Sequence, residues 1–488
     1  MSTFGGLNTA YTGLVAARQG LDVVGQNIAN ANTEGYTRQR VTTSAVDAAD
    51  RVGLMNSGVL PGQGVSVDGI ARLGSASLDA QVRATAAVAG YSAVRANALG
   101  AVEASMQEPG ENGLSAQLQE FWAGWGDVAN AAGETAPTGV LLAQAGAVTT
   151  QISRVYQAVS TQWSSERESV DTLVAEINGA AGQVAELNAR IRQSVAGGGN
   201  ANELIDRRSR LTTTLAALTG GTLVDRTDGT VDVLLGGNAL VTGDTARPLV
   251  ALGARTLDGP NGLTSPAGAT NPVRVEWADR AGAIPVDGGE LAGALSLLTR
   301  ADASGTGGAL AEAAVAYNSF ATNLAATVNG IYSTGDNSTL PGAFFGSTGT
   351  GPAALGLFVR PSTAAELTTG LAANGALDGS IADRIAQLGA GTAVDGAGNP
   401  VRSPSIDWSN VVTSLAVTTK NELRQASLAD LTSRAAVNAQ LSNSSVDLDE
   451  ENVNLLMFQH AYQGAARVLT AVDEMLDTLI NRTGLVGR

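Results

Sequence analysis

Residues 7–31 read LNTAYTGLVAARQGLDVVGQNIANA, and this stretch has the most regular pattern in the chain. Leucine or isoleucine recurs every seven residues, and alanine or valine fills the intermediate positions of the same heptads. Such a repeat is typical of a helix that packs along a second helix as a coiled coil. The positions that we expect to form an assembly seam are Leu7, Leu14, Leu21, Val24 and Ile28.

Three glycines follow the same heptad spacing beside the leucines, at Gly6, Gly13 and Gly20. Each glycine inside a helix costs about 1 kcal/mol relative to alanine. Close backbone approach by another helix would offset this cost. We therefore expect the three glycines to be close-packing positions against the helices of neighbouring subunits.

The C-terminal end carries a second heptad pattern. Nine of the ten alternating seam positions from residue 448 to residue 479 are apolar, and Glu451 is the exception. Because each terminal helix has an apolar stripe that it cannot bury alone, the two helices are natural partners. The apolar seam positions that we single out are Leu448, Leu455, Phe458, Tyr462, Leu469, Val472, Leu476 and Leu479.

The middle of the chain mixes helical and β-type patterns. A heptad stripe from Ile152 to Ser194 predicts one long helix, and weaker helical patterns occupy about 75–107, 113–131, 305–332 and 406–443. Short β-like runs separated by turn signals lie between residue 220 and about residue 285. The predicted fold is an α+β multidomain chain in which terminal heptad helices pair, a long helical bundle forms a rod, and a small β-rich domain is inserted.

These patterns also set the expected domain boundaries. Residues 1–35 with 446–488 form the terminal coiled-coil domain. The helical rod domain, with a short β region, comprises 36–219, 290–335 and 405–445, and the β-rich outer domain comprises 220–289. The Gly/Ala-rich segment 336–404 has no firm assignment and is expected to be part of the outer domain or a loop.

Composition excludes several classes of function. The 488 residues include no Cys, one His and one Lys, and 45 acidic against 29 basic residues give a formal net charge of −16. Thiolate metal sites, disulfides and a Cys nucleophile are excluded, and a basic nucleic-acid-binding face is not expected. We expect no catalytic residue, metal or cofactor, no membrane span, and a core role for Trp122, Trp125 and Trp163.

The chain ends resemble a known family. The C-terminal signature includes Val446–Glu451 and Tyr462, and the N-terminal motif comprises Asn27, Ile28, Ala29, Asn30, Asn32, Gly35 and Tyr36. Both are similar to the terminal motifs of the bacterial flagellar rod, hook and hook-associated proteins. Internal segments 202–208, 228–236 and 289–293 resemble the hook-associated members that join the hook to the filament.

The resemblance implies a structural axial component of the flagellum that self-assembles into a tubular homo-oligomer at the hook–filament junction. It implies an extracellular location after flagellar type III export without a cleaved signal peptide. The implied partners are hook protein, hook-associated protein 3 and a cytoplasmic export chaperone on the C-terminal seam. A hook or rod subunit of the same family is one alternative, and a secreted cell-wall glycan hydrolase is an alternative of a different class.

Overall fold

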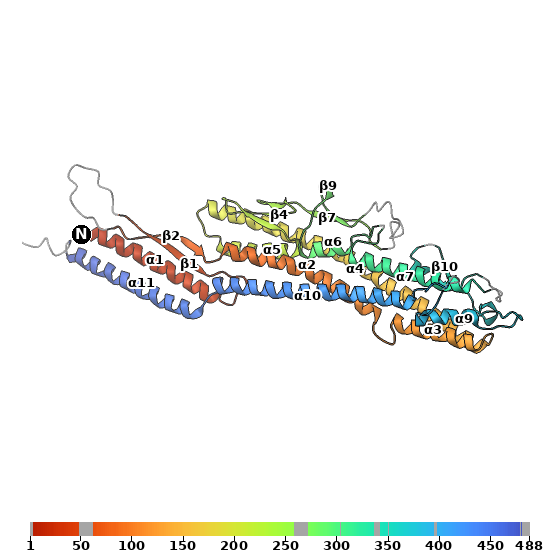
Figure 1. Ribbon diagram of the computed structural model, residues 1–488. Helices are drawn as coiled ribbons and strands as arrows, with labels where there is room; N and C mark the ends of the chain where they lie inside the picture. Colours follow the sequence, from red (N-terminus) through yellow and green to blue (C-terminus); the bar gives the residue numbers. More distant parts are fainter. Residues whose placement is uncertain are drawn as a thin grey trace, which may run out of the picture.

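The computed structural model describes residues 3–47, 62–257, 272–302, 304–335, 342–349, 351–394, 398–478 and 480. The molecule is an elongated rod with α1 (Thr3–Ala29) and α11 (Leu448–Asp477) side by side at one end (Figure 1). An antiparallel hairpin of β1 (Gln39–Ala45) and β2 (Val65–Arg72) contacts α1 and leads into the rod. The α+β class predicted from the sequence is confirmed.

Long helices form the rod. α10 packs along α2, α2 also contacts α5 and α6, and α7 packs against α4. Figure 1 shows α10 running along one edge of the rod toward α11. The bounds are α2 (Ala76–Met106), α4 (Thr135–Ala196), α5 (Asn202–Thr219), α6 (Gly289–Leu297), α7 (Ala309–Tyr332) and α10 (Pro404–Ser444).

The longest helix, α4, begins earlier than its heptad stripe predicts. The sequence indicates a start near Ile152, whereas the helix begins at Thr135 and runs for 62 residues. Pro137 lies in the first turn, where its missing N–H leaves no hydrogen bond unmade. Burial of Leu141 and Val148 stabilises this N-terminal part although it contains glycines.

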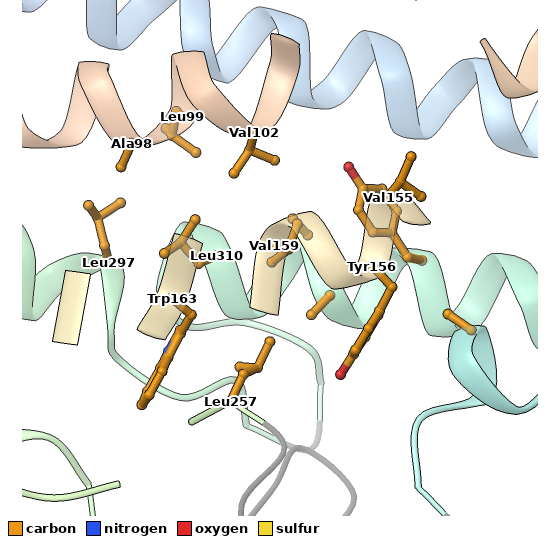
Figure 2. Close-up of a cluster of buried hydrophobic side chains, with 14 of the residues drawn as sticks. Ala98, Leu99, Val102, Val155, Tyr156, Val159, Trp163, Leu257, Leu297 and Leu310 are labelled. Carbon is orange, nitrogen blue, oxygen red and sulfur yellow. The ribbon is translucent and has the colours of Figure 1, made fainter. Parts of the chain in front are cut away.

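The core lies where α2, α4, α6 and α7 meet. Figure 2 shows Leu99 and Val102 of α2 facing Val159 of α4, with side chains of α6 and α7 beside them, whereas the Trp163 ring points away from α2. Leu99 and Val159 are fully buried. Trp122, Trp125 and Trp163 are all buried, as expected for core residues.

Two antiparallel sheets lie along one side of the rod (Figure 1). Residues 258–271, within the expected outer domain, lie outside the described part of the chain. The first sheet comprises β3 (Thr222–Asp225), β4 (Val231–Leu235), β5 (Asn238–Thr242) and β6 (Thr245–Ala246), and the second comprises β7 (Leu249–Leu252), β8 (Arg274–Trp277) and β9 (Arg280–Ala283).

Two asparagines of α4 attach these sheets to the rod. Asn178 exchanges two hydrogen bonds with the backbone of Leu249 in β7. Asn188 is fully buried, donates to the carbonyls of Val231 and Gly243, and accepts from the Val231 N–H. The sheets are therefore held against α4 by side chain–backbone bonds as well as by apolar packing.

The segment without a firm assignment covers the end of the rod farthest from α1. Its elements contact α3, α4 and α7, and apolar residues including Phe344, Ile385 and Leu388 are fully buried there. The elements of this end are α3 (Leu114–Asn130), β10 (Phe345–Ser347), α8 (Ala353–Gly356), β11 (Leu357–Val359), η1 (Ala364–Glu366) and α9 (Ser380–Ala390).

Candidate functional site

The terminal helices α1 and α11 pack as an antiparallel pair. Gly6 lies beside Val472, Gly20 lies against Phe458, and Asn27 is hydrogen-bonded to Glu451. From the first contact to the second each helix advances by two heptads in opposite directions, and from the second to the third by one. One antiparallel register therefore runs along the whole pair.

The predicted seam residues are buried to different degrees in this pair. Val24 and Val472 are buried, whereas Leu448 and Tyr462 are exposed. Leu479 lies outside the described residues. The half-buried seam residues are Leu7, Leu14, Leu21, Ile28, Leu455, Phe458, Leu469 and Leu476.

Smaller residues that the predicted seam omitted are the more buried ones. Ala10, Ala17 and Val23 are at most 5% exposed, whereas the leucines beside them are only half-buried. The heptad pattern itself contained Ala10 and Ala17 at its intermediate positions, so the signal was present in the sequence. The pair thus buries small side chains and leaves much of its leucine surface accessible.

The three heptad glycines have different surroundings. A Cβ added to Gly20 would lie 2.5 Å from the Phe458 ring, and one added to Gly6 would lie 3.9 Å from Val472 Cγ2. A Cβ at Gly13 would meet no atom within 4 Å. Within one chain, α11 thus already fills the space at Gly20 and touches Gly6, whereas Gly13 has free space.

A polar cluster lies where this helix pair meets the hairpin and the rod. We call Asn27, Tyr36, Arg38, Asp206 and Glu451 the joint. Its members come from α1, the loop before β1, α5 and α11, which brings both chain ends and the rod together. The joint is the candidate functional site because it fixes how the terminal pair is attached to the rod.

Asn27 is the centre of the joint and is almost fully buried. Its Nδ2 donates to the Gln39 carbonyl at 2.9 Å and to Glu451 Oε2 at 3.0 Å. Its Oδ1 accepts from the Gln39 N–H at 3.0 Å and from the Tyr36 hydroxyl at 2.9 Å. Both amide donors and both acceptor positions of Asn27 are used. Each buried polar atom of this side chain therefore has a hydrogen-bond partner that compensates for its loss of contact with water.

Glu451 is the polar exception in the C-terminal seam, and it is only 1% exposed. Arg38 Nε donates to Glu451 Oε1 at 2.8 Å, while the other Arg38 nitrogens reach Glu450. The hydrogen bond to Glu450 raises the pKa of Arg38 further above its ordinary value, against the effect of burial. The buried carboxylate is therefore paired with a permanent cation and with an amide donor.

Asp206 of α5 attaches this cluster to the rod. Its Oδ2 accepts from the Thr37 N–H at 3.1 Å, and its Oδ1 accepts from Arg72 Nε at 2.6 Å. Asn202, one turn earlier, donates to Gln39 Oε1 at 3.0 Å and to the Ile70 carbonyl at 3.1 Å. Both strands of the hairpin are thereby bonded to the start of α5.

Tyr36 is half-buried beside three carboxylates. Burial first, and then the charges of Glu203, Asp206 and Glu451, raise the pKa of Tyr36 to about 12. The phenol therefore keeps its proton and donates it to Asn27 at neutral pH. A phenolate here would face a carboxyl-rich, partly desolvated site.

The other residues of the N-terminal motif lie around the turn after α1. Asn30 donates to the Gln26 carbonyl and accepts from Thr33, whereas Ala29 and Asn32 are exposed. Gly35 has a φ of +73°, and a Cβ there would lie 2.6 Å from Arg210 Cδ. Glycine is thus required at this position by both conformation and space.

Sequence reasoning missed most of the joint. Asp447 is the N-cap of α11 and accepts from the N–H groups of Asp449 and Glu450. Arg38, Asp206 and Glu451 were not singled out as site residues. A signal was available at Glu451, because a charged residue interrupts an otherwise apolar seam.

Both α11 and α10 carry large apolar side chains that are exposed to solvent. Side chains of α11 at Val453, Leu456, Met457, Val468 and Met475 are between 51% and 66% exposed. Those of α10 at Val417, Leu423, Leu428, Leu431 and Leu441 are between 49% and 65% exposed. Exposed apolar patches of this extent mark interaction surfaces.

Two further searches cover the described ranges only. Within them, His, Asp and Glu side chains form no group of three or more that could hold a metal ion. No helix in the same ranges is long and apolar enough to cross a membrane.

Comparisons with known proteins agree with this architecture. The family described as "Flagellar hook-associated protein FlgK helical domain" matches residues 99–345. Residues 7–37 match the flagella basal body rod protein family, and residues 438–482 match the C-terminal family of the FlgEFG basal body rod proteins. The helical middle and both chain ends thus each match a flagellar family.

Individual proteins that are similar to this chain are also flagellar hook-associated or hook junction proteins. Flagellar hook-associated protein 1 of Bacillus subtilis is 29% identical, with 100% of both chains covered. The Salmonella typhimurium protein of that name is 30% identical over 50% of this chain and 44% of its own. The flagellar hook junction protein FlgK of Burkholderia pseudomallei has a similar fold, with a TM-score of 0.59 and 13% identity over 75% of this chain and 100% of that chain.

Terminal helices that pair at one end of a helical rod, together with these matches, define a structural axial component of the bacterial flagellum. Within that class, the chain belongs to the family of the flagellar hook-associated protein FlgK.

Proposed function

We propose that copies of this chain self-assemble into a tubular junction between the flagellar hook and filament. The α1–α11 pairs form the inner wall, the rod helices form the next shell, and the β3–β9 sheets face outward. The observation that carries this proposal is the apolar outer surface of α11, which one copy leaves exposed and a neighbouring copy can bury. Relatives named hook-associated protein and hook junction protein support the location.

The domain division of the sequence analysis belongs to this proposal. Residues 1–35 with 446–488 form the inner domain, and the rod and the inserted sheets lie at increasing distance from the tube axis. Segment 336–404 belongs to the rod in this scheme, because its described elements contact α3, α4 and α7. Gly13, which has free space around it, is the heptad glycine that a neighbouring helix could approach.

The proposed partners are a second copy, hook protein below and hook-associated protein 3 above. Before export without a cleaved signal peptide, a cytoplasmic chaperone covers the C-terminal helix. The exposed apolar residues of α11 support this last step, because they would otherwise promote association inside the cell. The mature location is extracellular, at the hook–filament junction.

Two measurements test this function. Gold-labelled antibody on isolated flagella should mark only the boundary between hook and filament, and labelling along the hook or rod would overturn the proposed location. Purified chains carrying Met457→Asp with Val468→Asp should not form sedimentable polymers, whereas Gln463→Asp at an exposed polar position of α11 should polymerise normally. Normal polymers from the double variant would contradict the role of this surface.

The protein acts through its shape and has no enzymatic step in this proposal. A hydrolase would need two carboxyl groups positioned on a bound glycan. Incubation of the purified chain with peptidoglycan should release no soluble fragments. Release of fragments would instead favour the secreted glycan hydrolase.

A further inference from the structure

Among the residues that the structure describes, the seam between α1 and α11 contains one buried carboxylate. Glu451 is 1% exposed, and its two oxygens accept from Asn27 and Arg38. The α11 side chains beside Gly20 and Gly6 of α1 are the apolar Phe458 and Val472. A single polar residue in an apolar seam is a known means of selecting one helix alignment over others.

Heptad spacing alone does not select one alignment of this pair. Gly6, Gly13 and Gly20 offer the same lack of a side chain at heptad spacing, and Phe458 occupies only the position at Gly20. If α11 moved by one heptad along α1 toward the N-terminus of α1, Phe458 would lie over Gly13. A Cβ at Gly13 has no neighbour within 4 Å. Such a move would displace α11 by about 10 Å along α1.

The two alignments differ in what happens to Glu451. After a one-heptad move it would face Gly20, which offers no side-chain donor, while Arg38 would stay with the hairpin. Asn27 would keep its bonds to Gln39 and Tyr36, because these lie in its own segment. The move therefore leaves one buried charge unpaired and costs Asn27 only one bond.

We propose that Glu451 is a positioning residue that selects the alignment of the C-terminal helix with the N-terminal helix. Through Arg38 and Asn27 it also sets where the pair stands relative to the rod. The three-residue connection between α10 and α11 is the competing determinant, together with the bond from the Arg38 N–H to the Ser444 carbonyl. Unwinding the last turn of α10 would lengthen this connection and let it follow a one-heptad move with Glu451 still in its helix.

The absence of cysteine from the chain permits a direct test on the full-length protein. Gly6→Cys with Val472→Cys reports the observed alignment, and Gly6→Cys with Ala465→Cys reports the alignment moved by one heptad. Disulfide formation in a glutathione buffer gives an effective concentration for each pair. With Glu451 present, we expect the first pair to be favoured at least tenfold.

Glu451→Leu should reduce this ratio at least tenfold, and Asn27→Leu with Glu451→Leu should do the same with no polar group left in the seam. Glu451→Gln should lower the ratio less than Glu451→Leu, because its one amide oxygen still accepts from Asn27 or Arg38 but carries no charge. A purely structural role would lower both disulfide yields together without changing their ratio. An unchanged ratio in both leucine variants, a parallel loss of both disulfides, or equal yields in the parent chain would overturn the proposal.

Discussion

Asn27 and Glu451 are 424 residues apart in the sequence and share a buried hydrogen bond of 3.0 Å. The bond joins the last turn of α1 to the first turn of α11, close to the hairpin that leads into the rod. Both residues have their other polar atoms bonded to the loop and strand after α1. The two ends of the chain are therefore attached to the rod at one place.

Asn27→Ala should destabilise the terminal pair more than any other single change in the N-terminal motif. The substitution removes one partner each from Glu451 and the Tyr36 hydroxyl and two bonds from the Gln39 backbone, and we expect the free energy of unfolding of the pair to fall by about 2–3 kcal/mol. Hydrogen exchange of α1 amides measures this change. Asn32→Ala removes an exposed asparagine of the same motif and should change protection by less than about 0.5 kcal/mol. Equal effects would contradict the central position of Asn27.

The Tyr36 phenol should make the joint sensitive to alkali. Its pKa is raised to about 12 in the folded chain, so the folded state holds this proton more tightly than the unfolded state. The contribution to stability is complete below the ordinary tyrosine pKa near 10 and is lost as the pH rises through 12. The difference in absorbance at 295 nm between parent and Tyr36→Phe should show a tyrosine that titrates late. A difference curve centred near pH 10 would contradict this.

Alanine at the heptad glycines should have opposite effects at two positions. Both substitutions gain up to about 1 kcal/mol of helix propensity. At Gly13 the new methyl group has free space within the chain, so Gly13→Ala should raise the protection of α1 amides. At Gly20 it would lie 2.5 Å from the Phe458 ring, so Gly20→Ala should lower it. Hydrogen exchange on the monomer compares the two, and matching changes would rule out tight packing at Gly20.

Asn188→Leu should release the first sheet from α4. The change removes the partners of the Val231 and Gly243 carbonyls and one partner of Arg208, all in a buried site. We expect a loss of about 2–4 kcal/mol and faster proteolytic cleavage within 222–257. Asn97→Leu on an exposed position of α2 is the control and should leave the cleavage rate unchanged. Slow cleavage in both variants would show that apolar packing alone retains the sheet.

The helices and strands were largely predictable because their signals are local. Heptad spacing located α1, α11 and most of α4, and alternating residues between turn signals located β3, β4, β5 and β8. The start of α4 was missed because its first turns contain proline and glycine and depend on burial against other helices. Segment 336–404 was also unassigned, since its short elements become stable only on α3, α4 and α7.

The joint was less predictable than the fold. Asn27 and Tyr36 were singled out as motif residues. Asp206 and Glu451 were only part of longer segments of resemblance, and the bonds that join them to the motif were not predicted. The glycines at 6, 13 and 20 were identified as a group, whereas their surroundings differ. A Cβ at Gly20 would meet a ring, and one at Gly13 would meet nothing.

By itself, the sequence determined that both ends are heptad helices, that a helical rod and inserted strands lie between them, and that thiol chemistry is excluded. Only the tertiary structure decided which polar residues meet across 424 positions and which glycine receives Phe458. Periodicity reports which face of a helix is buried. The choice and alignment of the partner depend on the path of the whole chain, because the same apolar spacing fits more than one register.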